Sequence, residues 1–338
     1  MNLIRFTPIA FESLGVRSMC TFIETPDVKI LIDPGVALGP RFRLLPHPKE
    51  YEALNDSREK IRKYSRIADV ITISHYHHDH FTPNFIDTTW LSSSPREAEI
   101  IYRGKIVMVK DARSATNVSQ RRRGWIFQTF CRKIASNTVI ADGRSFEYGD
   151  TRVRFSAPLP HGDESTELGS VLAMVIESPR EKFIHASDVQ GPMSESALQF
   201  ILNEEPSAVM IGGPPTYLSG VKVPKDSITR GMQNLEAIAR KVPLVIVDHH
   251  LLRDEDSIKE LSRISAAIRP LGRSIMTAAE YINERPRLLE ANRATLYHQD
   301  PPSRQFIKWT KLGKEKQRQA KPPLERKTRK RGRNSETH

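Results

Sequence analysis

The feature that most constrains this chain is a cluster of metal-ligand side chains directly after a short apolar run. Val70–Ile73 has the β-branched composition of a buried strand, and it leads through Ser74 into His75-Tyr76-His77-His78-Asp79-His80. Imidazole and carboxylate groups are the commonest protein ligands of zinc-like metals. A histidine-rich tract can also be a solvated loop, but this one follows a buried-type strand. The segment therefore predicts a metal site at a strand end.

Size and composition indicate a globular protein outside the membrane. The 338 residues can bury a large core, and 38% hydrophobic with 27% charged residues is an ordinary globular balance. No run of about eighteen apolar residues occurs, and the N-terminus lacks a signal-peptide pattern. Cys20 and Cys131 are too few for a disulfide framework, so we expect a reducing, cytoplasmic setting.

Most of the net charge of +12 lies near the C-terminus. Residues 311–338 contain eleven Lys or Arg and three Glu, a net charge of +8, so the rest of the chain is only mildly basic. Such a composition is typical of disordered polybasic segments. We therefore expect a single folded domain over residues 1–309 and a polybasic, disordered tail over 310–338.

Apolar strand-like runs alternate with amphipathic helical segments along the chain, which is typical of an α/β protein. Residues 23–29 also resemble residues 176–182, and each segment leads along an apolar strand to an aspartate, Asp33 or Asp188. This weak repeat predicts a duplicated β-hairpin, and hence two sheet-forming halves.

Further metal-ligand side chains follow other apolar strands. Because α/β folds collect functional groups at one edge of a sheet, we expect these side chains to converge. Side chains alternate along a strand, so His249 and His250 should point in opposite directions and only one of them should bind metal. The candidate ligands are His75, His77, Asp79, His80, His161, Asp188, and either His249 or His250.

This set, in this order, resembles the metallo-β-lactamase superfamily. His75, His77, Asp79 and His80 match its H-x-H-x-D-H signature in full. The Ser-Leu-Gly-Val-Arg-Ser and Asp-His-His-Leu-Leu-Arg-Asp stretches are similar to those of an uncharacterised archaeal group of these metallohydrolases. The resemblance covers roughly residues 3–270 and implies a four-layer αββα sandwich. One departure is that Asp188 follows Ala-Ser where the family usually has Gly.

The resemblance also implies a site for two divalent metal ions, usually zinc, with iron or manganese as alternatives. It assigns His75, His77 and His161 to one ion, and Asp79, His80 and His249 to the other, with Asp188 bridging both. Asp33 matches an aspartate that supports the site without binding metal. Asp33 and Asp248 are candidates to orient ligating histidines, whereas His78 and His185 are assigned outside the ligand set.

Two such ions, about 3.5–4 Å apart, can share a bridging hydroxide that attacks phosphorus or carbonyl carbon. Asp79 is the candidate to take or relay a proton. The first hypothesis is therefore a hydrolase of phosphoesters or phosphodiesters, including a nuclease. The second is a small-molecule hydrolase such as a lactonase, and the third is a nucleic-acid-associated metal-binding protein without hydrolase activity.

The expected partners are a phosphoester or other small-molecule substrate and nucleic acid. Nucleic acid would be bound through the basic tail and Arg121-Arg122-Arg123, because basic residues interleaved with aromatics bind phosphates and stack on bases. The alternative interpretation of residues 121–133 is a helix with a solvated basic face and an aromatic core face. The tail can equally be a solubilising extension without a partner.

Overall fold

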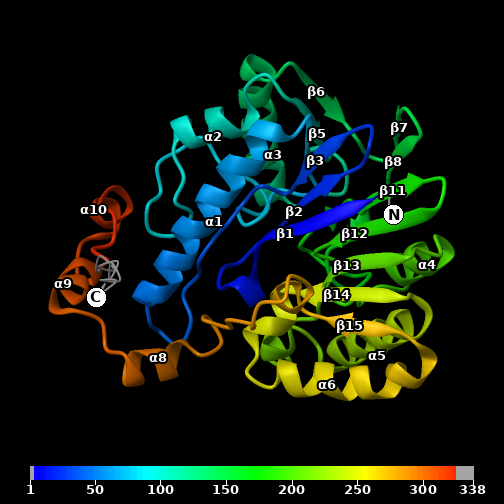
Figure 1. Ribbon diagram of the computed structural model, residues 1–338. Coiled ribbons are helices and arrows are strands. Elements are labelled where there is room, and N and C mark those ends of the chain that lie inside the picture. Colours follow the sequence, from blue (N-terminus) through cyan, green and yellow to red (C-terminus); the bar gives the residue numbers. More distant parts are fainter. Residues whose placement is uncertain (1–3, 325–338) are drawn as a thin grey trace, which may run out of the picture.

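The computed structural model describes residues 4–324 and consists of two mixed β-sheets packed face to face between two layers of helices (Figure 1). This is the four-layer αββα sandwich that the sequence predicts. Within the described part of the chain, no helix combines the length and apolarity needed to cross a membrane.

The first sheet has six strands in sequence order. Strands β1 to β3 are antiparallel to one another, and β3 to β6 are parallel. Helices α1, α2 and α3 cover its outer face. The bounds are β1 Arg5–Phe11, β2 Met19–Glu24, β3 Lys29–Ile32, β4 Val70–Ile73, β5 Ile106–Val109, β6 Asn137–Ile140, α1 Pro48–Ile67, α2 Pro95–Tyr102 and α3 Val118–Ile134.

The second sheet has seven strands in the order β15-β14-β13-β12-β11-β8-β7, with parallel pairing from β12 to β15. Helices α4, α5 and α6 cover its outer face, and β9 and β10 form a small separate ribbon. The bounds are β7 Ser145–Tyr148, β8 Thr151–Phe155, β9 Leu159–Pro160, β10 Ser170–Val171, β11 Met174–Ser178, β12 Glu181–Ser187, β13 Ala208–Gly212, β14 Leu244–Asp248, β15 Ser274–Met276, α4 Glu195–Asn203, α5 Lys225–Lys241 and α6 Ser257–Ile268.

Both faces of the central strands are buried, which explains their continuous apolar sequences. In β4, Val70 packs into the core between the sheets, whereas Ile71 and Ile73 pack toward the helices. The predicted repeat corresponds to two hairpins, β2–β3 and β11–β12. The second strand of each hairpin pairs in parallel with the next strand of its sheet. Each of these second strands is followed by an aspartate, Asp33 or Asp188, and both aspartates lie near the histidine turn.

The C-terminal segment returns to the α1 side of the molecule (Figure 1) and is folded as far as residue 324. Phe306 and Trp309 are buried in the core beneath α1, and the Trp309 indole donates to the Ala320 carbonyl at 2.8 Å. The prediction of a disordered tail from residue 310 is therefore wrong for residues 310–324, because aromatic anchors in the sequence just before them dock this segment. Residues 325–338 lie outside the described residues.

The remaining elements are η1 Glu12–Leu14, η2 Thr216–Leu218, η3 His249–Arg253, η4 Arg269–Leu271, α7 Ala278–Tyr281, α8 Arg293–Gln299, α9 Arg304–Thr310 and α10 Lys314–Gln319.

Candidate metal centre

The histidine turn begins where β4 ends. Its first peptide is fixed by Asp33 at the end of β3, whose Oδ1 accepts a hydrogen bond from the Ser74 backbone at 2.8 Å. Tyr76, in the middle of the turn, points away from the histidines into the core, and its hydroxyl donates to the Lys110 carbonyl. Anchoring at both points leaves His75 and His77 facing the second sheet.

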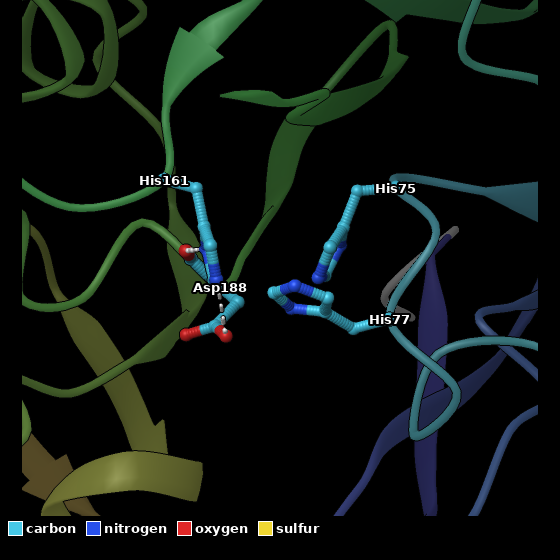
Figure 2. Close-up of side chains that lie close together, drawn as sticks. All are labelled: His75, His77, His161 and Asp188. Carbon is cyan, nitrogen blue, oxygen red and sulfur yellow. Dashed lines mark hydrogen bonds and ion pairs between the residues drawn. The ribbon is translucent and has the colours of Figure 1, made fainter. Parts of the chain in front are cut away.

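Four of the predicted ligands come together from both halves of the chain. His75 and His77 on the turn face His161, which follows β9, and Asp188, which follows β12 (Figure 2). One potential ligand atom from each of the four lies within 4.8 Å of the others. The structure thus gathers the group that the sequence analysis assigned to the first ion.

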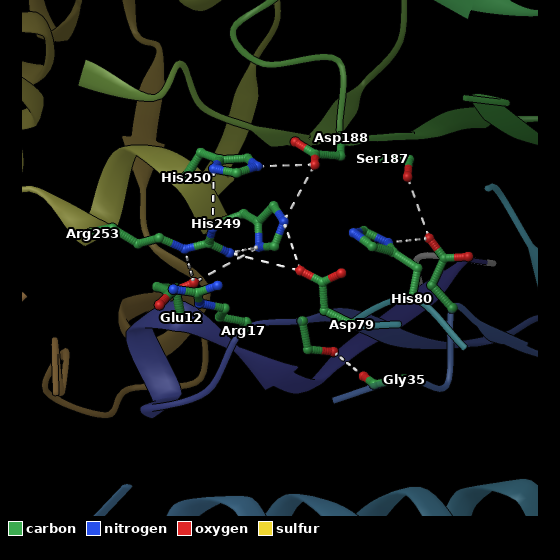
Figure 3. A network of polar contacts seen from close by, with 12 residues as sticks. Glu12, Arg17, Gly35, Asp79, His80, Ser187, Asp188, His249, His250 and Arg253 are labelled. Atoms are coloured by element: carbon green, nitrogen blue, oxygen red, sulfur yellow. Dashed lines mark hydrogen bonds and ion pairs between the residues drawn. The ribbon is translucent and has the colours of Figure 1, made fainter. Parts of the chain in front are cut away.

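A second group lies close to Asp188 (Figure 3). Asp79, His80 and His249 also bring ligand atoms within 4.8 Å of one another. The Nε2 atom of His249 lies 3.6 Å from Asp79 Oδ2 and 3.4 Å from Asp188 Oδ2. Asp188 thus belongs to the first group and also lies close to His249 of the second.

The chemistry of these residues fits divalent metal ions. Buried polar atoms are normally hydrogen-bonded, yet four atoms here have no hydrogen-bond partner among residues 4–324. They are His75 Nε2, His80 Nε2, His249 Nε2 and Asp188 Oδ1. Buried imidazole nitrogens without hydrogen-bond partners, gathered beside carboxylates, form the kind of environment that a metal ion requires.

Asp33 orients a histidine, as the sequence predicts. Its Oδ2 lies 2.8 Å from His80 Nδ1, so a proton is held on Nδ1, and Nε2 is the atom that can bind a metal once the ring is neutral. Ser187 stands where the family usually has Gly, and its φ of 55° lies in the left-handed region. Its hydroxyl donates to Ser74 Oγ at 2.7 Å, so a buried hydrogen bond holds the turn that Gly would adopt freely.

His249 and His250 both point to the centre. The prediction that they point in opposite directions is wrong, because β14 ends at Asp248 and the two residues begin the 3₁₀ helix η3, where strand alternation does not apply. His249 has a φ of 66°, and the two Nε2 atoms lie 3.4 Å and 3.2 Å from Asp188 Oδ2. Among residues 4–324, Asp248 makes no hydrogen bond to either ring; it accepts hydrogen bonds from the backbone of Ser13, His249 and Ala278 and so fixes the position of η3.

Sequence reasoning missed a buried ion pair behind these histidines. Arg253 Nε donates to Glu12 Oε2 at 2.9 Å, and both side chains are 3% exposed (Figure 3). The guanidinium also approaches His249, His250 and Tyr217. The position of Arg253 within one helical turn of His249 and His250 was a usable signal in the sequence, whereas nothing in the sequence pointed to Glu12.

His78 packs against Phe81 and Phe85, and His185 is a core residue whose Nε2 pairs with the Met19 carbonyl.

Burial keeps most of the candidate ligands in the form that binds metal. It lowers the pKa of His75 well below its ordinary value and the pKa values of His77 and His249 to about 3, so these imidazoles are neutral near pH 7. At His80, burial acts in the same direction, but the hydrogen bond and charge of Asp33, together with the charges of Asp79 and Asp188, outweigh it and raise the pKa to about 9.

These shifts predict how the stability of the metal-free protein depends on pH. Between pH 3 and 6.5 the unfolded chain binds more protons at His77 and His249 than the folded chain, so stability rises with pH in that window. Between pH 6.5 and 9 the folded chain binds more at His80, so that contribution falls. Glu12, with a pKa raised by burial to about 7, opposes the first trend, as do Glu50 and Asp248. Burial also lowers the pKa values of His75, His78, His185 and His250, which adds to the first trend. We expect the urea midpoint, measured with a chelator, to be higher at pH 6.5 than at pH 4.5 or 9; a flat profile would contradict this.

Gly35 allows the β3 end to lie against the histidine turn. A Cβ at this position would lie 2.2 Å from the Phe81 backbone nitrogen and 2.6 Å from that of His80. Because backbone atoms cannot move aside, we expect Gly35→Ala to destabilise the protein by roughly 1–3 kcal/mol and to lower its metal content. Gly313→Ala, where a Cβ would meet no atom within 4 Å, is the control. Equal urea midpoints and metal contents for the two variants would refute the expectation.

A cleft of about 790 Å³ borders the centre. Asp79 and His78 contribute to one side, together with Phe85 and Trp90. The C-terminal segment forms another wall with Thr310, Leu312, Lys314, Gln317 and Arg318. The segment predicted as a tail thus helps to shape the space beside the candidate ligands.

Residues 121–133 lie in one helix, α3, as the alternative interpretation holds. Phe127 is buried in the core, but Trp125 is 61% exposed, so the expected aromatic core face is only partly correct. Arg121 and Arg122 are exposed, whereas Arg123 is half-buried and donates to the Tyr76 carbonyl at 3.3 Å. The helix therefore presents a tryptophan and four basic residues on its surface, namely Arg121, Arg122, Arg132 and Lys133.

Comparison with known proteins agrees with this fold. The family model described as "Beta-lactamase superfamily domain" matches residues 16–230. A UPF0282 protein of Methanopyrus kandleri is 42% identical over 294 residues, which cover 87% of this chain and 99% of that protein. A UPF0282 protein of Thermococcus gammatolerans is 45% identical over 254 residues, covering 75% and 83%.

Among solved structures, unliganded yeast PDE1 aligns with a TM-score of 0.49 and 15% identity, covering 82% of this chain and 99% of that one. These values are too low to transfer an activity. The family match and the identity to the archaeal proteins are sufficient to place the chain. It belongs to the metallo-β-lactamase superfamily, within the group of archaeal UPF0282 proteins.

Proposed function

We propose that the protein is a hydrolase of phosphoesters or phosphodiesters that uses two divalent metal ions, with zinc as the first candidate and iron or manganese as alternatives. The observation that carries the proposal is the pair of ligand groups that adjoin Asp188, with the buried Nε2 atoms of His75, His80 and His249 left without hydrogen-bond partners among residues 4–324. His75, His77 and His161 would hold one ion, Asp79, His80 and His249 the other, and Asp188 both. Bound there, two such ions activate water at neutral pH and stabilise negative charge on the substrate.

The protein's own groups would support this chemistry in distinct ways. Asp33 holds the His80 ring, and Asp248 fixes the backbone of His249. Asp79 is the group proposed to accept or relay a proton, since its side chain is 17% exposed beside the cleft while Asp188 is 1% exposed. The remaining walls of the cleft would position the substrate and exclude water.

Positive charge beside the site favours phosphoesters over lactones. Lys314 and Arg318 line the cleft, and half-buried Arg123 contacts the turn. Such cations attract and orient anionic phosphate groups. Exposed Arg121, Arg122 and Trp125 support nucleic acid as a substrate or partner, since arginine and aromatic side chains together bind backbone phosphates and stacked bases.

Buried free thiols at Cys20 and Cys131 accord with the proposed cytoplasmic setting.

Metal analysis followed by a substrate panel tests the proposal. Full-length protein would be assayed with bis-p-nitrophenyl phosphate, p-nitrophenyl phosphate, single-stranded RNA and DNA, and lactones. We expect two metal ions per chain and phosphoester hydrolysis that His161→Ala and Asp79→Ala abolish. The matched control is His298→Ala, at an exposed histidine on α8. Fewer than one metal ion per chain would refute the dinuclear site. Turnover of lactones alone would favour a lactonase, and nucleic-acid binding without turnover would favour a metal-binding protein without hydrolase activity.

A further inference from the structure

The cleft beside Asp79 has an aromatic side. Phe85 and Trp90 both line it, and Phe85 packs edge-on against His78 of the histidine turn while 43% of its surface stays exposed. Large apolar side chains that remain in contact with water and gather in one concave place mark a binding site. At about 790 Å³ the cleft has the size of a small-molecule site. Leu38, Pro40, Leu45 and Leu312 extend this apolar side.

The same cleft has a basic side, which α10 provides. Lys314 and Arg318 both line the cleft, and their spacing of four residues places them next to each other on the helix. Arg318 Nε lies 3.6 Å from Asp87 Oδ2, but 58% of the Arg318 side chain is exposed, so its guanidinium can bind a further anion. Lys314 is exposed as well. Adjacent cations on the wall of a cleft attract anionic groups such as phosphate.

Asp87 fixes the aromatic side and the basic side to each other. Its Oδ1 accepts hydrogen bonds from the backbone of Trp90 at 2.8 Å and of Thr89 at 3.0 Å, while its Oδ2 pairs with Arg318. The Thr88 backbone also donates to the Arg318 carbonyl at 2.8 Å. The loop that carries Trp90 and the helix that carries Arg318 therefore form one framework before a ligand binds, and such pre-organisation lowers the entropic cost of binding.

An aromatic surface and two cations in one cleft match the two parts of a nucleotide, because nucleobases stack on aromatic side chains and phosphates pair with lysine and arginine. We propose that the cleft is a nucleotide-binding site, in which the base lies on Phe85 and Trp90 and a phosphate group lies at Lys314 and Arg318. Since Asp79 lines the same cleft, a nucleotide bound there presents its neighbouring phosphoester to the metal centre. This inference rests on the proposed function and narrows its substrates to esters of nucleotides, either free or within a single strand of nucleic acid.

Binding to the metal-free protein tests the site separately from catalysis. Calorimetric titration of the full-length protein in chelator would compare adenosine 5′-monophosphate with ribose 5-phosphate, which lacks only the base. We expect the nucleotide to bind about tenfold more tightly, the scale on which stacking against an aromatic side chain contributes. Equal affinities would overturn the nucleotide site even if phosphoesters are hydrolysed. Tighter binding of the nucleotide by a protein that hydrolyses no ester would instead refute the proposed function and leave the site in place.

Substitutions then locate the two parts of the ligand. Trp90→Leu and Phe85→Leu should weaken binding of the nucleotide by up to about tenfold and leave the affinity for ribose 5-phosphate unchanged, which also shows that these variants are folded. Lys314→Gln and Arg318→Gln should weaken the binding of both ligands. If neither aromatic substitution affected the nucleotide, the base would not lie in this cleft and the proposal would be wrong.

Matched controls lie close by, and a longer ligand distinguishes the two sources of the nucleotide. Phe42→Leu replaces a ring that is 47% exposed and does not line the cleft, and Lys316→Gln replaces an exposed lysine of α10 that does not line it either. Both should bind the nucleotide as wild type does. A short single-stranded oligoadenylate that binds more tightly than the mononucleotide, and is weakened by Trp90→Leu, would assign the site to nucleic acid, whereas equal affinity would assign it to free nucleotides.

Discussion

Asp188→Ala is expected to reduce metal content from two ions to fewer than one per chain and hydrolysis by roughly a thousandfold or more. Asp188 is common to the group with His75, His77 and His161 and to the group with His249 and His250. Its Oδ2 lies 3.4–3.5 Å from the Nε2 atoms of His249 and His161, so one substitution removes a ligand from both proposed ions.

The measurement pairs metal analysis with single-turnover kinetics, and Asp256→Ala, at an exposed aspartate, is the matched control. Circular dichroism and a thermal melt in chelator distinguish loss of metal from loss of fold. Asp188→Ala protein that is folded and still holds two ions would show that Asp188 does not bridge them.

Arg293→Leu is expected to destabilise the fold by about 3–5 kcal/mol, the usual result of leaving one member of a buried ion pair uncompensated. Arg293, at the start of α8, makes two hydrogen bonds of 2.7 and 2.8 Å to Glu50 in the first turn of α1, and both side chains are almost fully buried. Burial raises the pKa of Glu50 even with Arg293 present, so its carboxylate depends on this partner. The ion pair thus joins α8, in the C-terminal part of the chain, to α1 in the first helical layer.

Urea denaturation would measure the effect, with the double variant Glu50→Leu/Arg293→Leu as the decisive companion. Because an apolar pair carries no desolvation cost, the double variant should regain much of the lost stability. Lys259→Ala, which breaks an exposed ion pair with Asp256, should leave the urea midpoint unchanged. If Arg293→Leu were no more damaging than Lys259→Ala, the C-terminal segment would not depend on the buried pair.

Local sequence patterns predicted the parts of the site that lie next to one another in the chain. The H-x-H-x-D-H turn after Val70–Ile73, the aspartates after two apolar hairpins and the His249-His250 doublet all lie at the strand ends that the sequence indicates. Alternation failed at the doublet because β14 stops one residue earlier, and composition failed at residues 310–324 because buried aromatic residues outweigh a charged surface.

Local sequence patterns indicated the alternation of strands and helices and the candidate ligands, because periodicity and ligand chemistry are properties of short segments, whereas the sandwich architecture followed from the resemblance of the histidine motif to the metallo-β-lactamase superfamily. Only the tertiary structure decided what surrounds the histidine turn. Glu12 and Arg253 are 241 residues apart, and Arg293 and Glu50 are 243 apart. Partners so distant in the chain meet only when the two sheets pack against each other. The same packing brings His161, Asp188 and His249 to the histidine turn. It also gives His249 and His250 different hydrogen-bond partners.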